Sequence, residues 1–433
     1  MIHRNNKNAW ETGRYSLTYI GLSIYAFFSL TSMALMNVAV GFLLICLLLD
    51  RKPHSLLREI RDLFLAPQLK LYLFASLFLM GACIVSLISA QWFPLAFGGR
   101  TVSMHWLKDL GKLWYFVFPV FLVLAWRRLS DREYNNVLRV WILAFGLLSA
   151  LGPIQFFTGC LRPMPNPLLP GFFHPVLLLG HHLSVANIWI FPFFASLDIF
   201  FDPLLFKQLR VPRGLFFIIL SLGLFVLIFS YSRTLWVALP LGLLAWMSTR
   251  LPKKYLVADV LFLIGATGIL SQTPWIQSRL HSQMGIGERL SLWRTNFIFF
   301  QNRPIFGVGL GKNQDLTSYY FKWHLPYEDV VFVGHAHNVY LELLAGIGVV
   351  GLLAWCIWIG VQFALLHRIH HQKTTFNFAP GLLGAWIVFL VNGVTQVNFW
   401  EGKVLHQVMW VVGLTLFWTL RAPSPSLIRD KFA

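Results

Sequence analysis

Residues 213–250, RGLFFIILSLGLFVLIFSYSRTLWVALPLGLLAWMSTR, form two long apolar runs with a short polar interruption at Tyr231-Ser232-Arg233. A hydrocarbon core about 30 Å thick needs about 20 predominantly apolar residues per helix, and about 17 are tolerated. Each run reaches that length, so the stretch predicts two transmembrane helices joined by a tight turn. We therefore expect an all-α fold of the polytopic membrane class.

The composition of the whole chain agrees with this fold class. Of the 433 residues, 57% are hydrophobic and only 12% are charged, whereas soluble chains carry about 25% charged residues. The 18 tryptophans and 12 tyrosines also fit, since amphipathic rings gather at membrane interfaces. The net charge of +18 does not indicate nucleic acid binding, because the basic residues fall in short clusters between apolar runs. The four cysteines lie apart, with neither a disulfide framework nor metal-ligand spacing.

The same length criterion predicts about 12 transmembrane helices. The first apolar run follows a polar, basic start and leads directly into another run, which favours a retained helix over a cleaved signal peptide. The predicted spans are 15–31, 33–49, 70–90, 111–126, 136–158, 175–198, 213–231, 232–249, 254–272, 337–363, 378–397 and 404–420. The sequence shows no internal repeat and no soluble domain, so we predict one transmembrane domain over residues 1–433.

The basic residues predict how these spans are oriented. Twelve spans put both termini on one side, and with the termini inside, 23 of the 35 Lys and Arg residues lie in the inside segments. Cytoplasmic loops of membrane proteins carry such an excess. We therefore predict cytoplasmic termini and a large outward-facing loop over residues 273–336.

The remaining basic residues lie on the side that the positive-inside rule depletes. One explanation is solvation together with contacts to lipid phosphates. The other is an outer surface that binds polyanions such as diphosphates, and we expect some of these residues to do so. They are Arg100, Lys108, Lys112, Arg162, Arg233, Arg279, Arg289, Arg294, Arg303, Lys312, Lys322 and Lys403.

Residues 285–300 of the predicted outer loop have the pattern of an amphipathic helix. Apolar residues recur at spacings of four and three and form one stripe, suited to lying on the bilayer or on the helix bundle. The stripe consists of Ile286, Leu290, Trp293, Phe297 and Phe300. Arg289 shares another face with Asn296, whereas Arg294 lies about 140° away on an ideal helix. In the first turn, Arg289 adds to the positive helix end and is a candidate ligand for an anion.

The segment 304–313, PIFGVGLGKN, invites comparison with a nucleotide-binding P-loop. The motif fails, because Phe306 stands at its first glycine and Asn313 at its Ser or Thr. We interpret the segment as a tight turn whose backbone approaches another part of the protein closely. Lys312 within it is a candidate phosphate ligand.

The sequence Gly334-His-Ala-His-Asn338 precedes the tenth predicted span. In an extended stretch His335 and His337 would point the same way, but no third metal ligand lies at motif spacing and the chain has no D-x-D pair. We therefore predict a site with no metal and no cofactor, where arginine neutralises phosphate. An imidazole at the membrane surface is suited to be the general base for a sugar hydroxyl. The alternative for His337 is a helix cap or a hydrogen-bonded structural residue.

Arg233 is the other candidate, at the predicted outer turn where Ser232 is placed to cap the eighth span. A guanidinium beside a helix N-terminus is a good diphosphate ligand, although arginine at a membrane boundary also snorkels. His181 and His182 lie a few residues inside the sixth predicted span. For them we expect interhelical hydrogen bonds rather than catalysis.

These motifs, in this order, resemble the O-antigen ligase and polymerase superfamily. They are Tyr231-Ser-Arg233, Gly287-Glu-Arg289-Leu-x-x-Trp293-Arg294, Pro304-x-x-Gly-x-Gly309, His335-Ala-His-Asn338, and the Gly346-Ile-Gly348 run that follows Glu342. The resemblance implies a metal-independent inverting glycosyltransferase, with its site on the periplasmic side of a bacterial inner membrane. It implies transfer of O-antigen polysaccharide from undecaprenyl diphosphate to a sugar of lipid A-core.

The resemblance also implies roles for single residues. His337 would be the base that activates the acceptor hydroxyl, while Arg233 and Arg289 would hold the diphosphate and stabilise its charge as the glycosidic bond breaks. The further implied substrate contacts are His335 and Asn338, which would orient the base or a sugar, and Arg100, Lys108 and Lys112, which would meet acceptor phosphates. The expected partners are the two lipid-linked substrates and membrane lipids, with no nucleic acid and no obligate protein partner.

Three alternatives remain open at this point. An O-antigen polymerase shares the donor chemistry but extends one lipid-linked chain with another. A protein O-oligosaccharyltransferase is a further relative, although many of those are longer and carry an added outer domain. A multi-span lipid or sugar transporter would need mid-bilayer carboxylates or an inverted repeat, whereas Asp198 and Asp259 lie near the predicted cytoplasmic ends of their spans.

Overall fold

The structure, a computed structural model, describes residues 16–49, 53–93, 95–97, 100–101, 107–250, 252–281, 286–324, 334–371 and 378–421. These residues are predominantly helical, which confirms the all-α fold class. The exception is a short ribbon in which β1 (Ala96–Phe97) pairs with β2 (Arg100–Thr101) in antiparallel register.

Most helices follow one another with short connections, whereas residues 159–181 form a long connection without a helix. In the first half they are α1 (Leu17–Phe28), α2 (Met33–Leu49), α3 (Pro53–Phe64), α4 (Pro67–Trp92), α5 (Leu107–Leu110), the 3₁₀ helix η2 (Gly111–Phe116), α6 (Phe118–Arg127), α7 (Asp131–Thr158), α8 (His182–Phe201) and α9 (Pro203–Leu209). In the second half they are α10 (Arg213–Phe229), α11 (Arg233–Arg250), the 3₁₀ helix η3 (Lys253–Tyr255), α12 (Leu256–Ser271), α13 (Pro274–His281), α14 (Ile286–Asn302), α15 (Lys312–His324), α16 (Val339–His371), α17 (Ala379–Asn392) and α18 (Gly402–Leu420).

Each of the 12 predicted spans contains a helix, but the helices differ in length. Within the described residues, α4, α7, α8, α16 and α18 are long and apolar enough to cross a membrane. A sixth span results if α9 and α10, which meet at a bend of 102°, are counted together. Helices α1, α2 and α17 and the segment Val257–Ile269 of α12 are shorter apolar helices. The structure therefore supports a polytopic membrane protein, and the number 12 stays a prediction.

Local sequence explains where the long helix α7 begins and ends. The Ser130 hydroxyl accepts a hydrogen bond from the Glu133 amide, and the Glu133 carboxylate accepts one from the Ser130 amide. This capping box satisfies two amides that the first turn leaves without helical partners. The helix ends at Gly159, whose φ of 65° lies in the left-handed region that glycine adopts without strain.

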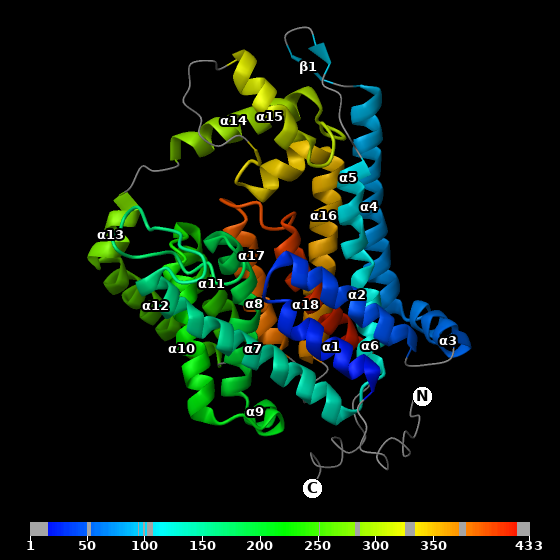
Figure 1. Ribbon diagram of the computed structural model, residues 1–433, viewed down its shortest axis with the longest axis vertical. Coiled ribbons are helices and arrows are strands. Elements are labelled where there is room, and N and C mark those ends of the chain that lie inside the picture. The colour runs from blue at the N-terminus through cyan, green and yellow to red at the C-terminus, as the bar shows by residue number, and fades with distance from the viewer. Residues whose placement is uncertain are drawn as a thin grey trace.

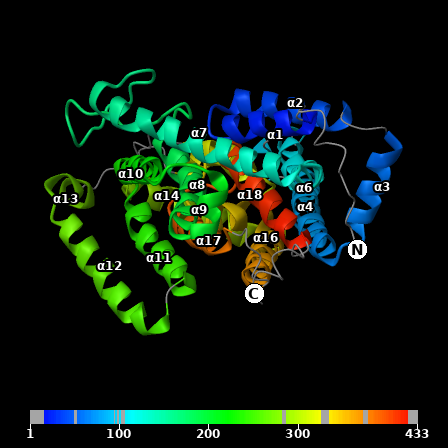
Figure 2. The same cartoon turned by 90° about the horizontal axis from the view of Figure 1, so that it is seen from below.

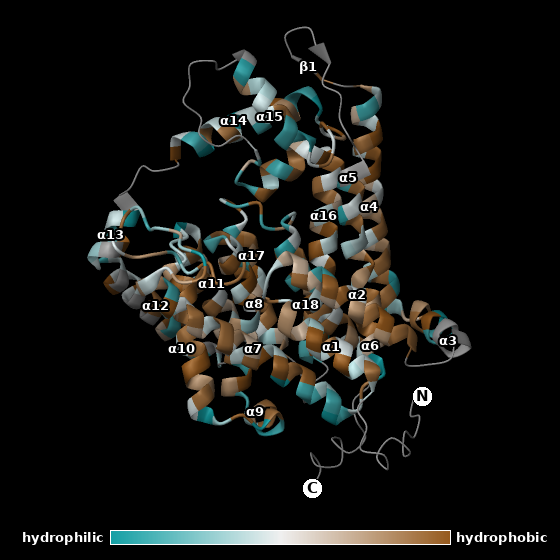
Figure 3. Ribbon diagram, viewed as in Figure 1, coloured by the Kyte–Doolittle hydropathy of each residue, from teal (hydrophilic) through white to brown (hydrophobic). Residues whose placement is uncertain are grey.

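The bundle has two distinct ends. At the base end, Ser16 donates its amide to Glu133 at 3.0 Å and Arg421 pairs with Asp131, so both limits of the described chain meet the start of α7. At the loop end, which is uppermost in Figure 1, lie α14 and α15, and α13 lies lower at the left. Figure 3 shows the bundle helices mainly hydrophobic and the segments at the loop end richer in hydrophilic residues. Seen from below, α3 and α12 lie on opposite sides of the bundle (Figure 2).

Helices α8, α11 and α17 pack closely on one another. A Cβ atom on Gly242 of α11 would lie 2.8 Å from the Gly384 carbonyl oxygen of α17, and one on Gly384 would lie 2.7 Å from the Gly242 carbonyl oxygen. Glycine at both positions lets the two backbones touch, as small residues do between membrane helices. The ring of Phe194 from α8 covers the same contact.

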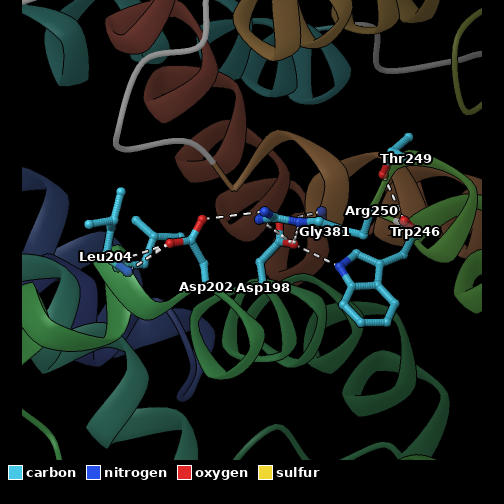
Figure 4. Close-up of polar contacts among 8 residues, drawn as sticks. Asp198, Asp202, Leu204, Trp246, Thr249, Arg250 and Gly381 are labelled. Atoms are coloured by element: carbon cyan, nitrogen blue, oxygen red, sulfur yellow. Dashed lines mark hydrogen bonds and ion pairs between the residues drawn. The ribbon is translucent and has the colours of Figure 1, made fainter. Parts of the chain in front are cut away.

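A buried acid ties these three helices together near the base end (Figure 4). Asp198, near the end of α8, is fully buried and accepts hydrogen bonds from the Trp246 indole at 2.7 Å and the Gly381 amide at 2.6 Å. Arg250, the last residue of α11, pairs with Asp198 at 2.9 Å and with Asp202 at 3.3 Å. A buried charge is tolerated when it is paired and hydrogen-bonded in this way. Asp198 thus takes part in fixed structural contacts.

The amphipathic helix predicted at 285–300 is α14, and its existence is confirmed. The residues that it buries are Leu292, Thr295, Asn296 and Phe299 rather than the predicted stripe. Leu290 and Phe297 of that stripe are 57% and 47% exposed. The bundle, one of the two surfaces predicted for the stripe, therefore packs on a neighbouring face of α14, which α15 and α16 contact. The bilayer remains the predicted partner of the stripe.

Residues 304–311, hereafter the glycine turn, approach another segment closely, as predicted. The amides of Val308 and Gly309 donate to the carbonyl oxygens of Ala345 and Gly346 in α16 at 2.8 and 2.9 Å. Gly307 has a φ of 68°, and a Cβ there would lie 2.4 Å from the Gly346 oxygen. Helix α16 is kinked at this contact. The backbone of the α14–α15 connection is thus joined directly to the backbone of α16.

Candidate functional site

Arg233 opens α11 at the loop end. The Ser232 hydroxyl accepts a hydrogen bond from the Leu235 amide at 3.4 Å, so the predicted cap is confirmed. Tyr231, just before it, has a φ of 55°, which turns the chain sharply between α10 and α11. Arg233 is therefore the first residue of a helix whose N-terminal amides favour an anion.

Two further arginines share the electrostatic field of Arg233. Burial and the positive charges of Arg233 and Arg289 lower the pKa of Arg279, on α13, to about 10. Burial and the charge of Arg233 also lower the pKa of Arg289, on α14, against an opposing effect of Glu288. Three guanidiniums that repel one another across three helices form a site that a diphosphate would stabilise. The Arg279 Nε donates to the Tyr231 carbonyl oxygen at 3.3 Å, which fixes α13 to the turn before Arg233.

His337 belongs to the same field. Burial, His335, Arg289 and His181 together lower the pKa of His337 to about 3. Burial lowers the pKa of His335 to about 4. The two rings meet edge to face, with their centroids 4.3 Å apart. At neutral pH the His337 imidazole is therefore neutral, which is the form that accepts a proton, but with this pKa it is a weaker base than an imidazole that titrates near neutrality.

His335 and His337 lie in a turn and not in an extended stretch, the conformation in which their side chains would point the same way. His337 has a φ of 49°, and its amide donates to the His335 Nδ1 at 3.3 Å. The next residue, Asn338, caps α16, because its side-chain oxygen accepts from the amides of Tyr340 at 2.9 Å and Leu341 at 3.0 Å. A side-chain cap of this kind fixes the helix start. Asn338 thus has a structural function in holding the turn, beside any contact with substrate.

We expected His181 and His182 a few residues inside a span, but they lie at the start of α8. His182 is the first residue of α8, and its ring stacks on those of His174 and His181 at centroid distances of 4.3 and 4.8 Å. Among the described residues its Nδ1 has no hydrogen-bond partner, so this atom does not make the expected interhelical bond. Burial is the main cause that lowers the pKa of His174 to about 4, and the charge of Arg279 lowers it further. This stack of imidazoles therefore borders the arginines.

A comparison with known protein families shows which family the segment around this site resembles. Residues 216–356 match the family model described as O-antigen ligase. This segment, about a third of the chain, is therefore similar to the O-antigen ligase family. No curated protein matches it significantly.

The segment shared with the O-antigen ligase superfamily runs from α10 into α16. It contains all three arginines of the site and the His335–His337 turn. The resemblance stated from the sequence motifs is thereby confirmed at the level of the superfamily. The histidine stack lies before this segment, so the rest of the chain contributes its own residues to the site.

Of the other basic residues predicted to contact substrate, the structure describes the side chains of Lys312 and Lys112. Lys312 is 3% exposed, with its ammonium 2.7 Å from Asp109 and 3.5 Å from Asp315. Acids within the protein compensate its charge, and its function as a phosphate ligand stays a prediction. Lys112 lines a small pocket together with Gln314, Glu342 and Trp400. The side chains of Arg100, in β2, and Lys108, in α5, lie outside the described residues.

A buried network of amide side chains contacts Ser232, the residue before Arg233. The Gln396 side chain donates to the Ser232 hydroxyl at 2.9 Å, and Asn392 and Asn398 donate to the Asn187 oxygen at 2.7 and 3.1 Å. The network joins the loop ends of α8, α11 and α17 to the segment before α18. Sequence reasoning missed these residues, and the signal for them was four amides within apolar runs, where uncompensated polar groups are costly.

Proposed function

We propose that this protein is an O-antigen ligase, which transfers O-antigen polysaccharide from undecaprenyl diphosphate to a sugar of lipid A-core. The observation that supports this most is the meeting of three arginines with a neutral imidazole in one field. Cations suited to a diphosphate and a base suited to a hydroxyl are the two requirements of glycosyl transfer from a lipid diphosphate.

The chemistry follows from these positions. The neutral His337 takes the proton of the acceptor hydroxyl while the hydroxyl oxygen attacks the anomeric carbon of the donor. The bond from that carbon to the diphosphate oxygen breaks, and undecaprenyl diphosphate leaves with the electron pair. Arg233, Arg279 and Arg289 stabilise the negative charge that grows on the leaving oxygen. Attack opposite to the leaving group inverts the anomeric centre, and His337 then returns its proton to water.

We also propose that the loop end faces the periplasm of a bacterial inner membrane and that both termini are cytoplasmic. The excess of Lys and Arg in the segments assigned to the inside supports this orientation. On this basis residues 1–433 form one transmembrane domain, and residues 273–336 carry most of its periplasmic surface. The acceptor would approach from the membrane beside α14.

The test is reconstitution of the reaction. The purified protein is mixed with undecaprenyl-diphosphate-linked O-antigen and lipid A-core, without ATP and with a chelator. We expect O-antigen-capped lipopolysaccharide from the wild type and a rate lowered by about 10²–10⁴-fold in His337→Ala. His371→Ala, at the other end of α16, is the matched control and keeps activity. Absence of capped product from the wild type would sink the proposal.

A second arm separates the ligase from a polymerase. Supplied with the lipid-linked repeat unit alone, a polymerase lengthens it, whereas a ligase leaves it unchanged. Lengthening without any lipid A-core would replace the ligase by the polymerase and keep the same site residues.

A further inference from the structure

Glu342 is an acidic residue at a buried position, where a carboxyl group is unusual. It lies in the first turns of α16 and is 3% exposed. Burying a carboxylate is costly unless hydrogen bonds satisfy it. Its partners therefore indicate what the residue does.

The first partner is the turn that carries the candidate base. The Ala336 amide donates to the Glu342 Oε2 at 2.8 Å. Ala336 separates His335 from His337, whose left-handed φ of 49° is uncommon for a residue with a side chain. Such a conformation persists only when its surroundings hold it. The carboxylate thus fixes the backbone from which both imidazoles project.

The second partner leads to the helix of Arg289. The Gln314 side chain, on α15, donates to the Glu342 Oε1. Its neighbour Asn313 donates to the Asn296 side-chain oxygen on α14 at 2.8 Å. Asn296 is fully buried and lies seven residues, or about two helical turns, beyond Arg289. The contacts therefore run from the His337 turn through α15 to α14.

We propose that Glu342 is a positioning residue, which holds the His337 turn at a fixed place relative to Arg289. This inference rests on the proposed function. Both carboxylate oxygens accept hydrogen bonds from within the protein, so Glu342 acts through His337 and not on the substrate. Asn338, directly after the turn, caps the start of α16, so hydrogen bonds hold the backbone within the turn and just beyond it.

The first measurement is the kinetics of Glu342→Gln. Glutamine keeps the size of the side chain, but it presents one amide NH₂ where two donors converge, so one of the two contacts is lost. A displacement of about 1 Å costs roughly a hundredfold in rate. We expect kcat to fall by about that factor while KM for the donor stays near the wild-type value, because Arg233, Arg279 and Arg289 remain in place.

A double-mutant cycle distinguishes positioning from general loss of structure. In a His337→Ala background, Glu342→Gln should cause no further loss, because the base on which Glu342 acts is already absent. Glu133→Gln is the matched control, since Glu133 also accepts backbone hydrogen bonds but lies at the base end. We expect this control to keep kcat per folded molecule.

The outcomes are separable. A wild-type kcat in Glu342→Gln, or an independent and multiplicative loss in the double variant, would overturn the positioning function. If Glu342→Gln does not fold, Gln314→Ala removes the second contact and is expected to lower kcat several-fold with an unchanged donor KM. An unchanged kcat in that variant would also overturn the inference. Full activity of His337→Ala would instead contradict the proposed function itself.

Discussion

Arg233 and Arg250 stand at opposite ends of α11, and their surroundings differ in kind. Arg250 pairs with two acids at 2.9 and 3.3 Å, so its charge is used to hold α8, α11 and α17 together. Arg233 adds its charge to those of Arg279 and Arg289 and lowers the pKa of both. At one end of the helix the arginine pairs with two acids, and at the other the arginine acts electrostatically on two further arginines. We infer that the base end serves stability and the loop end serves binding.

The strongest way to break this comparison is to remove Arg289. Loss of one preorganised donor at a developing oxyanion costs about 10²–10³ in kcat, so we expect Arg289→Ala to lower kcat/KM towards a thousandfold. The measurement is the rate of capped lipopolysaccharide formation at matched protein amounts. Arg294→Ala, on an exposed face of the same helix, is the control. Equal rates for the two variants would contradict a special function of Arg289.

Removing Asp198 tests the other end. Asp198→Ala leaves Arg250, the Trp246 indole and the Gly381 amide without their shared acceptor. We expect the free energy of unfolding to fall by about 3 kcal/mol, while kcat per folded molecule changes little. Denaturation in detergent measures the first quantity.

Asp62→Ala is its control, because the Asp62–Arg61 pair is exposed on both sides and such pairs contribute about 0–1 kcal/mol. A large loss of kcat in folded Asp198→Ala, without loss of stability, would make the base cluster part of the catalytic site and remove the distinction between the two ends.

A smaller effect is expected at Arg279, which touches the site through the Tyr231 carbonyl and through charge. Arg279→Gln keeps a hydrogen-bond donor but removes one of three positive charges. We expect KM for the lipid diphosphate donor to rise about tenfold, or roughly 1.4 kcal/mol, with a smaller change in kcat. Lys322→Gln, an exposed residue of α15, removes the same charge and should leave KM unchanged. An unaltered KM in Arg279→Gln would limit the binding site to two arginines.

The smallest effect concerns pH. An imidazole in solution titrates near 6.5, but burial and neighbouring charges lower the pKa of His337 to about 3. Since the pKa is lowered, the neutral base persists as the pH falls and is protonated only near pH 3. We expect kcat/KM, which reports the free enzyme, to lose little between pH 7 and pH 5. A half-maximal loss near pH 6.5 would show that His337 titrates normally or that another histidine is the base.

Local patterns in the sequence predicted the helices and part of the site. Arg233, Arg289 and His337 could be selected because each stands beside a recognisable helix start or turn. Arg279, His174 and Glu342 could not be singled out, since their importance arises from contacts with segments far away in the chain. The buried face of α14 could not be predicted for the same reason. Periodicity shows that a helix has an apolar face, while packing against α15 and α16 decides which face is buried.

The amide network beneath Arg233 has a consequence for biosynthesis. Asn187 and Ser232 enter the membrane with α8 and α11, whereas Asn392, Gln396 and Asn398 leave the ribosome about 160 to 210 residues later. Until α17 arrives, the first two polar groups lie among lipid or early helices without the partners they have in the folded protein, which is unfavourable in hydrocarbon. The loop end is therefore completed late, and chains truncated before α17 are expected to be targets for quality-control proteolysis.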